Sequence, residues 1–359
     1  MYNIHLLPGS FGDCILIEYG KADALNYILI DGGPYFNFEL MAEALKTKAP
    51  NLKKLELLIV THIDIDHIDG MLRLLNQAIL PFSIEQIWFN GFEQIMPLLP
   101  LGMLGYLQGD YLSMRIKELE IPHNACYFKG QAIVITDYKA LPHFFLPGGM
   151  EILLLSPDRA SLSRQAIDWE HTSEFINNIE KLREKFEDDN RYSELGVLGD
   201  EIDIKTLQNA AEIPDTSLAN ESSIAFIGSY EHKSCLFSGD APSDALLRAI
   251  RPLIDQQGQE RLILNAWKVA HHGSKKSTIN SLMERVDAQK LLISSNGTKY
   301  GHPNLETIAK LFKNANRPLE FYFNYKTEFN KMWDGDDYKK QYKYEAFYPG
   351  DAFGITVEL

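Results

Sequence analysis

The hydrophobic positions of this chain form short apolar runs, separated by turn residues and by stretches with helical spacing. The opening stretches HLLPGSFGDCILIEYG and ALNYILIDGGPYF predict two strands, each flanked by glycine turns. The run LELLIV at 55–60 is continuously apolar, which is typical of a strand covered on both faces. Apolar residues at helical spacing in FELMAEALKTKA predict a helix between these strands.

The same alternation continues along the chain. MLRLLNQAIL has a helical pattern that stops before Pro81, and IEQIWFNGF predicts another short strand. Strands alternating with helical segments predict an α/β architecture. Later strand signals occur in SSIAFIGSY, SCLFSGD, LILNAWKVAHHGS, LLISSNGTKYGHP, LEFYFNY and FGITVEL.

Two segments interrupt this alternation. Residues 158–215 are rich in charge and helix formers, which predicts a helical insertion that is either a lid or a solvated surface helix. Residues 326–345 predict a polar tail loop, which would gate substrate if it lay near a site. A length of 359 residues allows two average domains, but we expect one domain over 1–359 with these two additions.

Composition narrows the classes of function. The chain has 35 Lys and Arg against 49 Asp and Glu, a net charge of −14, which argues against a broad, non-specific nucleic-acid binder. A local basic groove, or bound metal ions, would still allow an anionic substrate. Three cysteines far apart favour free thiols in a reducing compartment. With no signal-peptide pattern at the start and no apolar run of about 20 residues, we expect a soluble, cytoplasmic protein without a membrane partner.

The strongest chemical signal is the segment HIDIDH at 62–67, directly after the buried strand. It places two imidazoles and two carboxylates in a loop that can turn its side chains inward around a cation, and Gly70 relieves the turn. These ligand types suit zinc, manganese or iron. The motif therefore predicts a metal site at the end of this strand.

This motif resembles the His-x-His-x-Asp-His signature of the metallo-β-lactamase superfamily, with Asp64 at the second histidine position. The same substitution is a feature of the hydrolase domain of the bacterial competence DNA-uptake channel protein and its soluble relatives. The resemblance covers most of the chain outside 158–215 and 326–345. Further matching blocks are GSFGDCILIEYG with YILIDGGP, NESSIAFIGSYEHKSCLFSGDAP, WKVAHHGSKKST and ISSNGTKYGHPNLET.

The resemblance implies a four-layer αββα sandwich with two divalent ions, zinc or manganese, at one edge between the sheets. It implies that His62 and Asp64 hold the first metal, and that Asp66 and His67 hold the second. The family's histidine near LLLSPDR is missing, so we expect the first metal to be weakly held. An aspartate-rich ligand set shifts the preference toward Mn²⁺, although zinc stays open.

The resemblance also implies that Asp240 of SGD bridges both metals. His302 of YGHP or His271 of HHGS would complete the second site, and the choice among His271, His272 and His302 stays open. A histidine that is not a ligand would give a hydrogen bond or proton to the leaving oxygen, which makes His271 a catalytic candidate beside Asp66.

Residues around these motifs suggest roles in binding and positioning. Ser274 and Lys275 of HHGSKKS suit a phosphate, although a solvated turn explains the lysine as well. Asp31 of DGG either orients a ligand histidine through a hydrogen bond or only forms a turn.

The ligand set predicts a metal-dependent hydrolase in which a hydroxide bridging the two metals is the nucleophile. Phosphodiesters fit this arrangement, which favours a phosphodiesterase or nuclease acting on nucleic acid or nucleotides. Two alternatives stay open. One is a hydrolase of a small ester, lactone or thioester, and the other is a component of a bacterial defence or signalling system that needs a protein partner.

Overall fold

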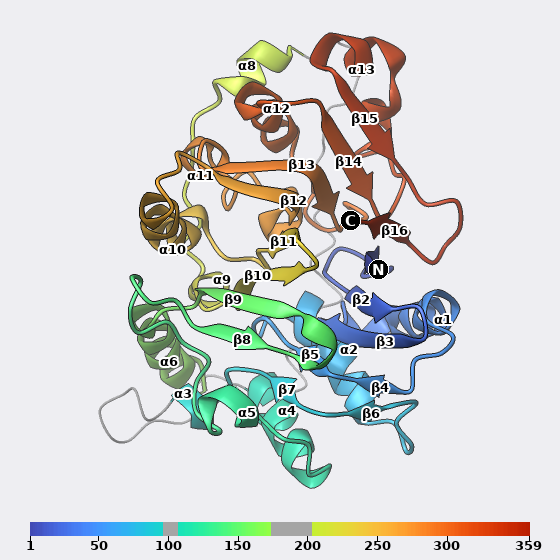
Figure 1. The fold of residues 1–359 in the computed structure, drawn as a ribbon, viewed down its shortest axis with the longest axis vertical. Helices are drawn as coiled ribbons and strands as arrows, with labels where there is room; N and C mark the ends of the chain where they lie inside the picture. Colours follow the sequence, from blue (N-terminus) through green and yellow to red (C-terminus); the bar gives the residue numbers. More distant parts are fainter. Residues whose placement is uncertain (96–106, 174–202) are drawn as a thin grey trace.

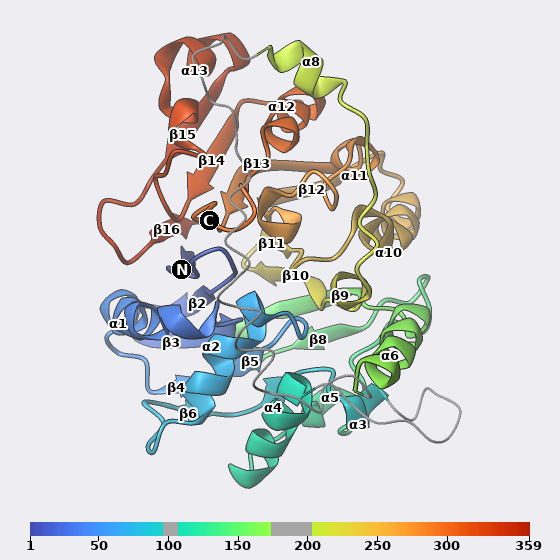
Figure 2. The same ribbon diagram turned by 180° about the vertical axis from the view of Figure 1, so that it is seen from behind.

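The computed structural model describes residues 1–95, 107–173 and 203–359. Two large β-sheets lie at its centre, and helices lie on both outer sides (Figures 1 and 2). The two ends of the chain lie side by side, because the last strand pairs with the first. Among the described residues, no helix combines the length and apolar character needed to cross a membrane.

The first sheet has six strands in the order β16-β1-β2-β3-β5-β7. Its strands are antiparallel from β16 to β3 and parallel from β3 to β7. The structure differs from the prediction at the N-terminus, because the stretch HLLPGSFGDCILIEYG reverses direction at PGSFGD and so contributes to two strands. The bounds are β16 Ile355–Glu358, β1 Tyr2–Leu6, β2 Ile15–Lys21, β3 Ala24–Ile30, β5 Leu57–Ile59 and β7 Ile87–Trp88.

The second sheet has eight strands in the order β15-β14-β13-β12-β11-β10-β9-β8. It is parallel from β11 to β15 and antiparallel from β8 to β11. The bounds are β15 Tyr344–Phe347, β14 Leu319–Phe323, β13 Val286–Ile293, β12 Leu262–Lys268, β11 Lys233–Phe237, β10 Ala225–Tyr230, β9 Glu151–Ser156 and β8 His143–Phe145. A separate two-stranded sheet pairs β4 (Lys54–Leu55) with β6 (Ser83–Ile84).

Helices cover the outer faces of both sheets. Helices α1, α2 and α4 lie beside the first sheet, and α10, α11 and α12 lie beside the second (Figures 1 and 2). The bounds are α1 Phe38–Lys48, α2 Ile65–Leu75, α3 Phe92–Ile95, α4 Leu107–Glu118, α5 Ala125–Phe128, α6 Arg159–Ser173, α8 Ile204–Gln208, α9 Leu218–Glu221, α10 Ser243–Gln256, α11 Asn280–Met283, α12 Leu305–Asn314 and α13 Asp336–Tyr342. Short 3-10 helices are η1 Tyr35–Asn37, η3 Pro147–Gly149, η4 Ala270–Gly273 and η5 Lys331–Asp334.

The core confirms that the first sheet is buried on both faces. In β2, Ile15 and Ile17 face the core between the sheets, whereas Leu16 packs with α1 and α2 on the outer side. The apolar run of β5 divides in the same way, because successive strand side chains point to opposite faces. The predicted fold class, an α/β αββα sandwich, is therefore confirmed.

The predictions for the two segments that interrupt the strand–helix alternation, 158–215 and 326–345, have different outcomes. Helices α6 and α8 lie within 158–215, but 174–202 lies outside the described residues, and the insertion within one domain stays a prediction. At 326–345 the structure differs from the predicted loop, since the segment contains η5, α13 and the start of the edge strand β15. Trp333 is fully buried there and packs against Phe312 of α12, so this segment also contributes to the core.

Two glycines allow the loops around the first sheet to approach helix α2 closely. A Cβ on Gly12 would lie 1.9 Å from the carbonyl oxygen of Asp66, in the first turn of α2. A Cβ on Gly70 would lie 2.0 Å from the carbonyl oxygen of Gly32, which follows β3. Only hydrogen fits at these positions, so the start of α2 is held against the ends of neighbouring strands.

We expect Gly70→Ala to destabilise the protein by about 1–3 kcal/mol. Replacing glycine by alanine inside a helix ordinarily stabilises the folded protein by about 1 kcal/mol. A destabilised Gly70→Ala variant would therefore show that the added methyl group clashes with Gly32. The free energy of unfolding in urea measures it, and a stabilised variant would contradict the close packing of α2 against Gly32.

Candidate metal centre

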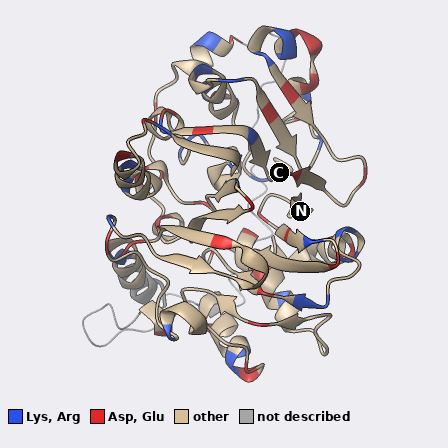
Figure 3. Cartoon of the chain, in the orientation of Figure 1, with Lys and Arg blue, Asp and Glu red and all other residues tan. Residues whose placement is uncertain are grey.

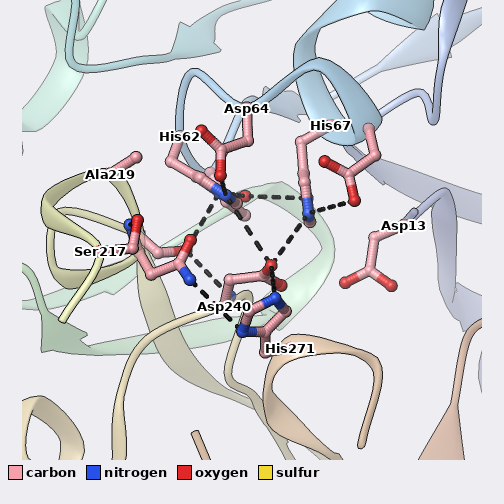
Figure 4. Close-up of polar contacts among 12 residues, drawn as sticks. Asp13, His62, Asp64, His67, Ser217, Ala219, Asp240 and His271 are labelled. Atoms are coloured by element: carbon pink, nitrogen blue, oxygen red, sulfur yellow. Dashed lines mark hydrogen bonds and ion pairs between the residues drawn. The ribbon is translucent and has the colours of Figure 1, made fainter. Parts of the chain in front are cut away.

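The sequence motifs meet at the carboxyl ends of strands from both sheets. HIDIDH links β5 to α2, Asp240 follows β11, HHGS follows β12, and His302 lies between β13 and α12. Asp64 precedes α2 in an extended conformation, and its carbonyl oxygen accepts hydrogen bonds from the first turn of the helix. Its side chain makes no capping bond and instead faces His62. Figure 4 shows His62, His67 and His271 pointing toward Asp240.

Three residues, Asp66, His67 and His272, form a compact group whose ligand atoms lie within 4.8 Å of one another, and Asp240 lies beside it. Asp240 Oδ2 lies 3.4 Å from His67 Nε2 and 3.6 Å from His272 Nε2. Asp66 Oδ2 lies 3.5 Å from His272 Nε2 and 4.0 Å from His67 Nε2. A tetrahedral ion with bonds of about 2.0–2.2 Å separates its ligand atoms by about 3.3–3.6 Å. Asp66, His67 and His272 are therefore spaced to hold one divalent ion, with Asp240 next to the two histidines.

A second group shares Asp240. His62 Nε2 lies 3.7 Å from Asp64 Oδ2 and 3.9 Å from Asp240 Oδ2. On the other side of Asp240, His271 Nε2 lies 3.7 Å from the same carboxylate oxygen. This group is more open than the first, since the side chain of Asp64 is 43% exposed. Asp240 thus lies between both groups, where a bridging ligand would be.

Buried polar atoms without hydrogen bonds support this interpretation. In the part of the chain that the structure describes, Nε2 of His62, His67 and His272 and Oδ1 of Asp240 have no hydrogen-bond partner. Unpaired buried polar atoms are rare because each loses its contacts with water. Several of them around one point indicate that a cation is the missing partner.

Hydrogen bonds on the far side of the rings orient the histidines. Asp31 Oδ2 lies 2.8 Å from His67 Nδ1, and the same carboxylate accepts from the backbone N–H and the hydroxyl of Thr61. His62 Nδ1 lies 2.9 Å from the Thr61 hydroxyl. Protons held at Nδ1 leave the Nε2 lone pairs free for a metal. The geometry fits the orienting role proposed for Asp31.

Asp13 and Lys268 support His272 in a way that sequence reasoning missed. His272 Nδ1 lies 3.0 Å from the Ser294 carbonyl oxygen and 3.2 Å from Asp13 Oδ1. Lys268 is fully buried, and its Nζ lies 2.7 Å from Asp13 Oδ2. Asp13 was predictable only as a turn residue, because its two partners are more than 250 positions away in the chain.

The HHG turn has an unusual backbone. His271, His272 and Gly273 have φ values of 48°, 55° and 85°, all in the left-handed region. Two consecutive histidines in this region carry strain, which persists only where surrounding contacts fix it. His271 Nδ1 lies 3.0 Å from Asp215 Oδ2 and 2.9 Å from the Ser277 hydroxyl. These contacts direct the opposite nitrogen, Nε2, toward Asp240.

Electrostatics at the centre favour positive charge. Burial alone would lower the pKa of His67, but Asp240 and Asp31 outweigh it and raise this pKa well above its usual value. At His272 burial is likewise outweighed by Asp240 and Asp13, and the pKa rises to about 9. Burial would raise the pKa of Asp240, but the surrounding imidazoles hold it well below its usual range. The carboxylates therefore stay ionised and attract cations.

The structure separates the three histidines that the sequence left open. His272 joins the compact group, and His271 faces Asp240 from the outer side. His302 lies beside them, with ring centroids 5.5 Å from His271 and 6.4 Å from His272. No carboxylate oxygen of the described residues lies within 4.0 Å of its ring nitrogens, and burial with the charges of His271 and His272 lowers its pKa to about 3. Like Nε2 of His67 and His272, His302 Nδ1 is buried without a hydrogen-bond partner among the described residues, and its role as a ligand stays a prediction.

The proposed phosphate contacts are partly engaged elsewhere. Lys275 Nζ lies 2.8 Å from Glu306 Oε1, which neutralises part of its charge. Ser274 is buried, and its hydroxyl accepts the backbone N–H of Lys276. Substrate binding by Ser274 and Lys275 stays a prediction.

Comparisons with known proteins give one family match and several distant structural similarities. The family model described as the metallo-beta-lactamase superfamily matches residues 7–90, which span β2, β3, β5 and the HIDIDH segment. No curated protein matches the chain. The short form of human tRNase Z is a similar solved structure, with 10% identity and a TM-score of 0.40, covering 100% of this chain and 99% of that one. Zn²⁺-bound PqqB from Methylobacterium extorquens has 12% identity and a TM-score of 0.42, covering 100% of both chains.

The match over residues 7–90 and the αββα sandwich support the fold of the metallo-β-lactamase superfamily, whose members are mostly metal-dependent hydrolases that use divalent ions. The His and Asp groups of this chain supply ligand atoms of the kind that such ions need.

We expect His272→Ala to weaken Zn²⁺ or Mn²⁺ binding by at least about a hundredfold, because it removes one of four closely spaced ligand atoms. His302→Ala is the matched control and should retain metal. Metal analysis and calorimetric titration measure both, with circular dichroism to confirm folding. Loss of metal in His302→Ala alone would refute the assignment of His272.

We expect Asp215→Asn to weaken metal binding or lower turnover by about 10–100-fold, because it releases His271 from its fixed orientation. Asp203→Asn is a suitable control, since Asp203 only caps α8. If Asp215→Asn behaved as wild type while His271→Ala lost function, Asp215 would not position His271.

Proposed function

We propose that this protein is a metal-dependent phosphodiesterase or nuclease. The observation that carries the proposal is the convergence of four imidazole Nε2 atoms on Asp240, within 3.4–3.9 Å of one carboxylate oxygen. The resemblance of the motifs to the hydrolase domain of the competence DNA-uptake channel protein supports the same class of reaction.

The ligands divide between two ions of zinc or manganese. Asp66, His67 and His272 would hold one ion, His62 and Asp64 would hold the other, and Asp240 would be a ligand available to both. When bound, divalent ions act as Lewis acids that polarise a phosphoryl group and lower the pKa of water. Three carboxylates beside two divalent ions leave the site positive, which favours an anionic substrate, and the oxygen-rich ligand set suits Mn²⁺.

His271 is the residue of the site best placed to move a proton. Its side chain is 21% exposed, whereas those of His62, His67 and His272 are fully buried, so His271 is the imidazole that a substrate meets. Asp215 holds its Nδ1, and Nε2 is directed into the site. His271 therefore gives a proton from Nε2 to the leaving oxygen, and Asp215 stabilises the positive charge that His271 carries before the transfer.

The net charge of −14 does not oppose a local anionic substrate. Lys and Arg are spread around the molecule and interspersed with Asp and Glu in Figure 3. Attraction of a phosphate therefore depends on the metal centre and on individual nearby cations, which favours short or single-stranded substrates over an extended duplex. A protein partner and a cytoplasmic location remain predictions.

We expect the Mn²⁺- or Zn²⁺-loaded protein to cleave single-stranded DNA, RNA or cyclic nucleotides, and Asp240→Asn to lose at least about a hundredfold in kcat/KM. Asp244→Ala, an exposed aspartate in the first turn of α10, is the matched control and should be unaffected. Absence of phosphodiester cleavage with metal confirmed bound would refute the proposal. Turnover of esters, lactones or thioesters under the same conditions would then favour the small-molecule alternative.

A further inference from the structure

A row of aromatic rings leads from the metal centre to the surface. The ring of His302 lies 5.9 Å from that of Tyr300, Tyr300 lies 5.9 Å from Phe11, and Phe11 lies 5.9 Å from Phe36. These residues come from three separate segments, namely the loop before α12, the loop after β1, and η1. The proposed metal ligands do not explain why they gather here.

The outer part of this row is exposed although its support is buried. Phe36 is 67% exposed and Tyr300 is 46% exposed, whereas Phe11, which contacts both, is 7% exposed. A large aromatic ring that stays exposed to water does not gain the free energy of hydrophobic burial. Groups of such exposed apolar side chains commonly mark binding sites. The row is therefore available to stack on a flat ligand.

A lysine adds positive charge to the same surface. Lys299 Nζ lies 4.9 Å from the ring centroid of Phe11 and 5.0 Å from that of Tyr300. No carboxylate oxygen of a described residue lies within 4.0 Å of this ammonium group, in contrast to Lys275, which pairs with Glu306. Its charge remains available to an anion next to the rings.

The metal ligands are also close to this row. The ring of His302, which lies next to Tyr300 in the row, is 5.5 Å from that of His271 and 6.4 Å from that of His272. A strand whose phosphate lies at the metal centre would therefore meet Tyr300 first, and Phe36, two ring contacts further out, with groups further along. Proteins that bind single-stranded nucleic acid combine the same elements, a cation for the backbone and exposed aromatic rings for the bases.

We propose that Phe36, Phe11, Tyr300 and Lys299 form a stacking platform for a nucleobase next to the scissile phosphodiester. The proposal rests on the phosphodiesterase function and specifies its substrate as single-stranded nucleic acid or a nucleotide. Phe36 supplies the open ring face, Phe11 supports it, and Lys299 contacts the adjacent phosphate. Stacking tolerates any base, so the platform confers preference for a base without sequence specificity.

The test measures binding and does not require cleavage. The protein is incubated with Mn²⁺ and titrated into a labelled phosphorothioate oligothymidylate, which resists hydrolysis, or into an abasic strand of equal length. Fluorescence anisotropy should show tighter binding of the thymidylate strand. Phe36→Ala should weaken that binding by about five- to a hundredfold and leave binding of the abasic strand unchanged.

Two further variants make the result specific. Phe36→Trp should retain the preference, and the difference between its fluorescence and that of the wild type, which has four tryptophans, should report quenching by the stacked base. Phe145→Ala is the matched control, since Phe145 is 61% exposed on the edge strand β8.

Three outcomes would overturn the platform: equal binding of both strands, binding of neither, or an unchanged preference in Phe36→Ala. Each is distinct from failure of the proposed function, which is judged by cleavage alone. Cleavage without base preference would support the phosphodiesterase function and reject the stacking platform. Base-dependent binding without cleavage would support the platform and reject the nuclease function.

Discussion

The site depends on one buried carboxylate, that of Asp240. Its side chain is 3% exposed and has four imidazoles within 3.9 Å, so its charge is removed from water and must be balanced by neighbouring positive charge. Protons on the histidines can provide that balance, which explains why their pKa values are raised. Divalent ions provide it better, because they also satisfy the Nε2 atoms that lack hydrogen bonds.

The sandwich fold holds these charged side chains close together. Strands from both sheets end at the same edge, and each contributes a loop whose side chains turn inward. Close contact at Gly12 and Gly70 fixes the start of α2, which carries Asp66 and His67. Carboxylates on the far side of the rings then hold the Nδ1 atoms, so the ligands are preorganised before any ion arrives.

The support around the ligands differs between the two groups. Asp31, Asp13 and the buried Lys268 enclose His67 and His272 in rigid contacts. The group that contains His62 and Asp64 is more exposed and lacks the histidine that the family has near 153–159. His271, held by Asp215 from the segment at 158–215, occupies the side of Asp240 that faces this group. Accordingly, the group with fewer supporting contacts is also the more exposed of the two.

The sequence by itself determined the α/β class and the strand in front of HIDIDH, because local periodicity depends only on neighbouring residues. The αββα sandwich and the candidate role of Asp240 followed instead from the resemblance of its motifs to the metallo-β-lactamase superfamily. It could not choose among His271, His272 and His302, since adjacent histidines differ only in the direction that the strained HHG turn gives them. It also missed the supporting roles of Asp13, Lys268 and Asp215. It predicted a loop at 326–345 because most residues there are polar, although Trp333 among them is buried. These features depend on contacts between residues far apart in the chain, and only the packing of the two sheets brings them together.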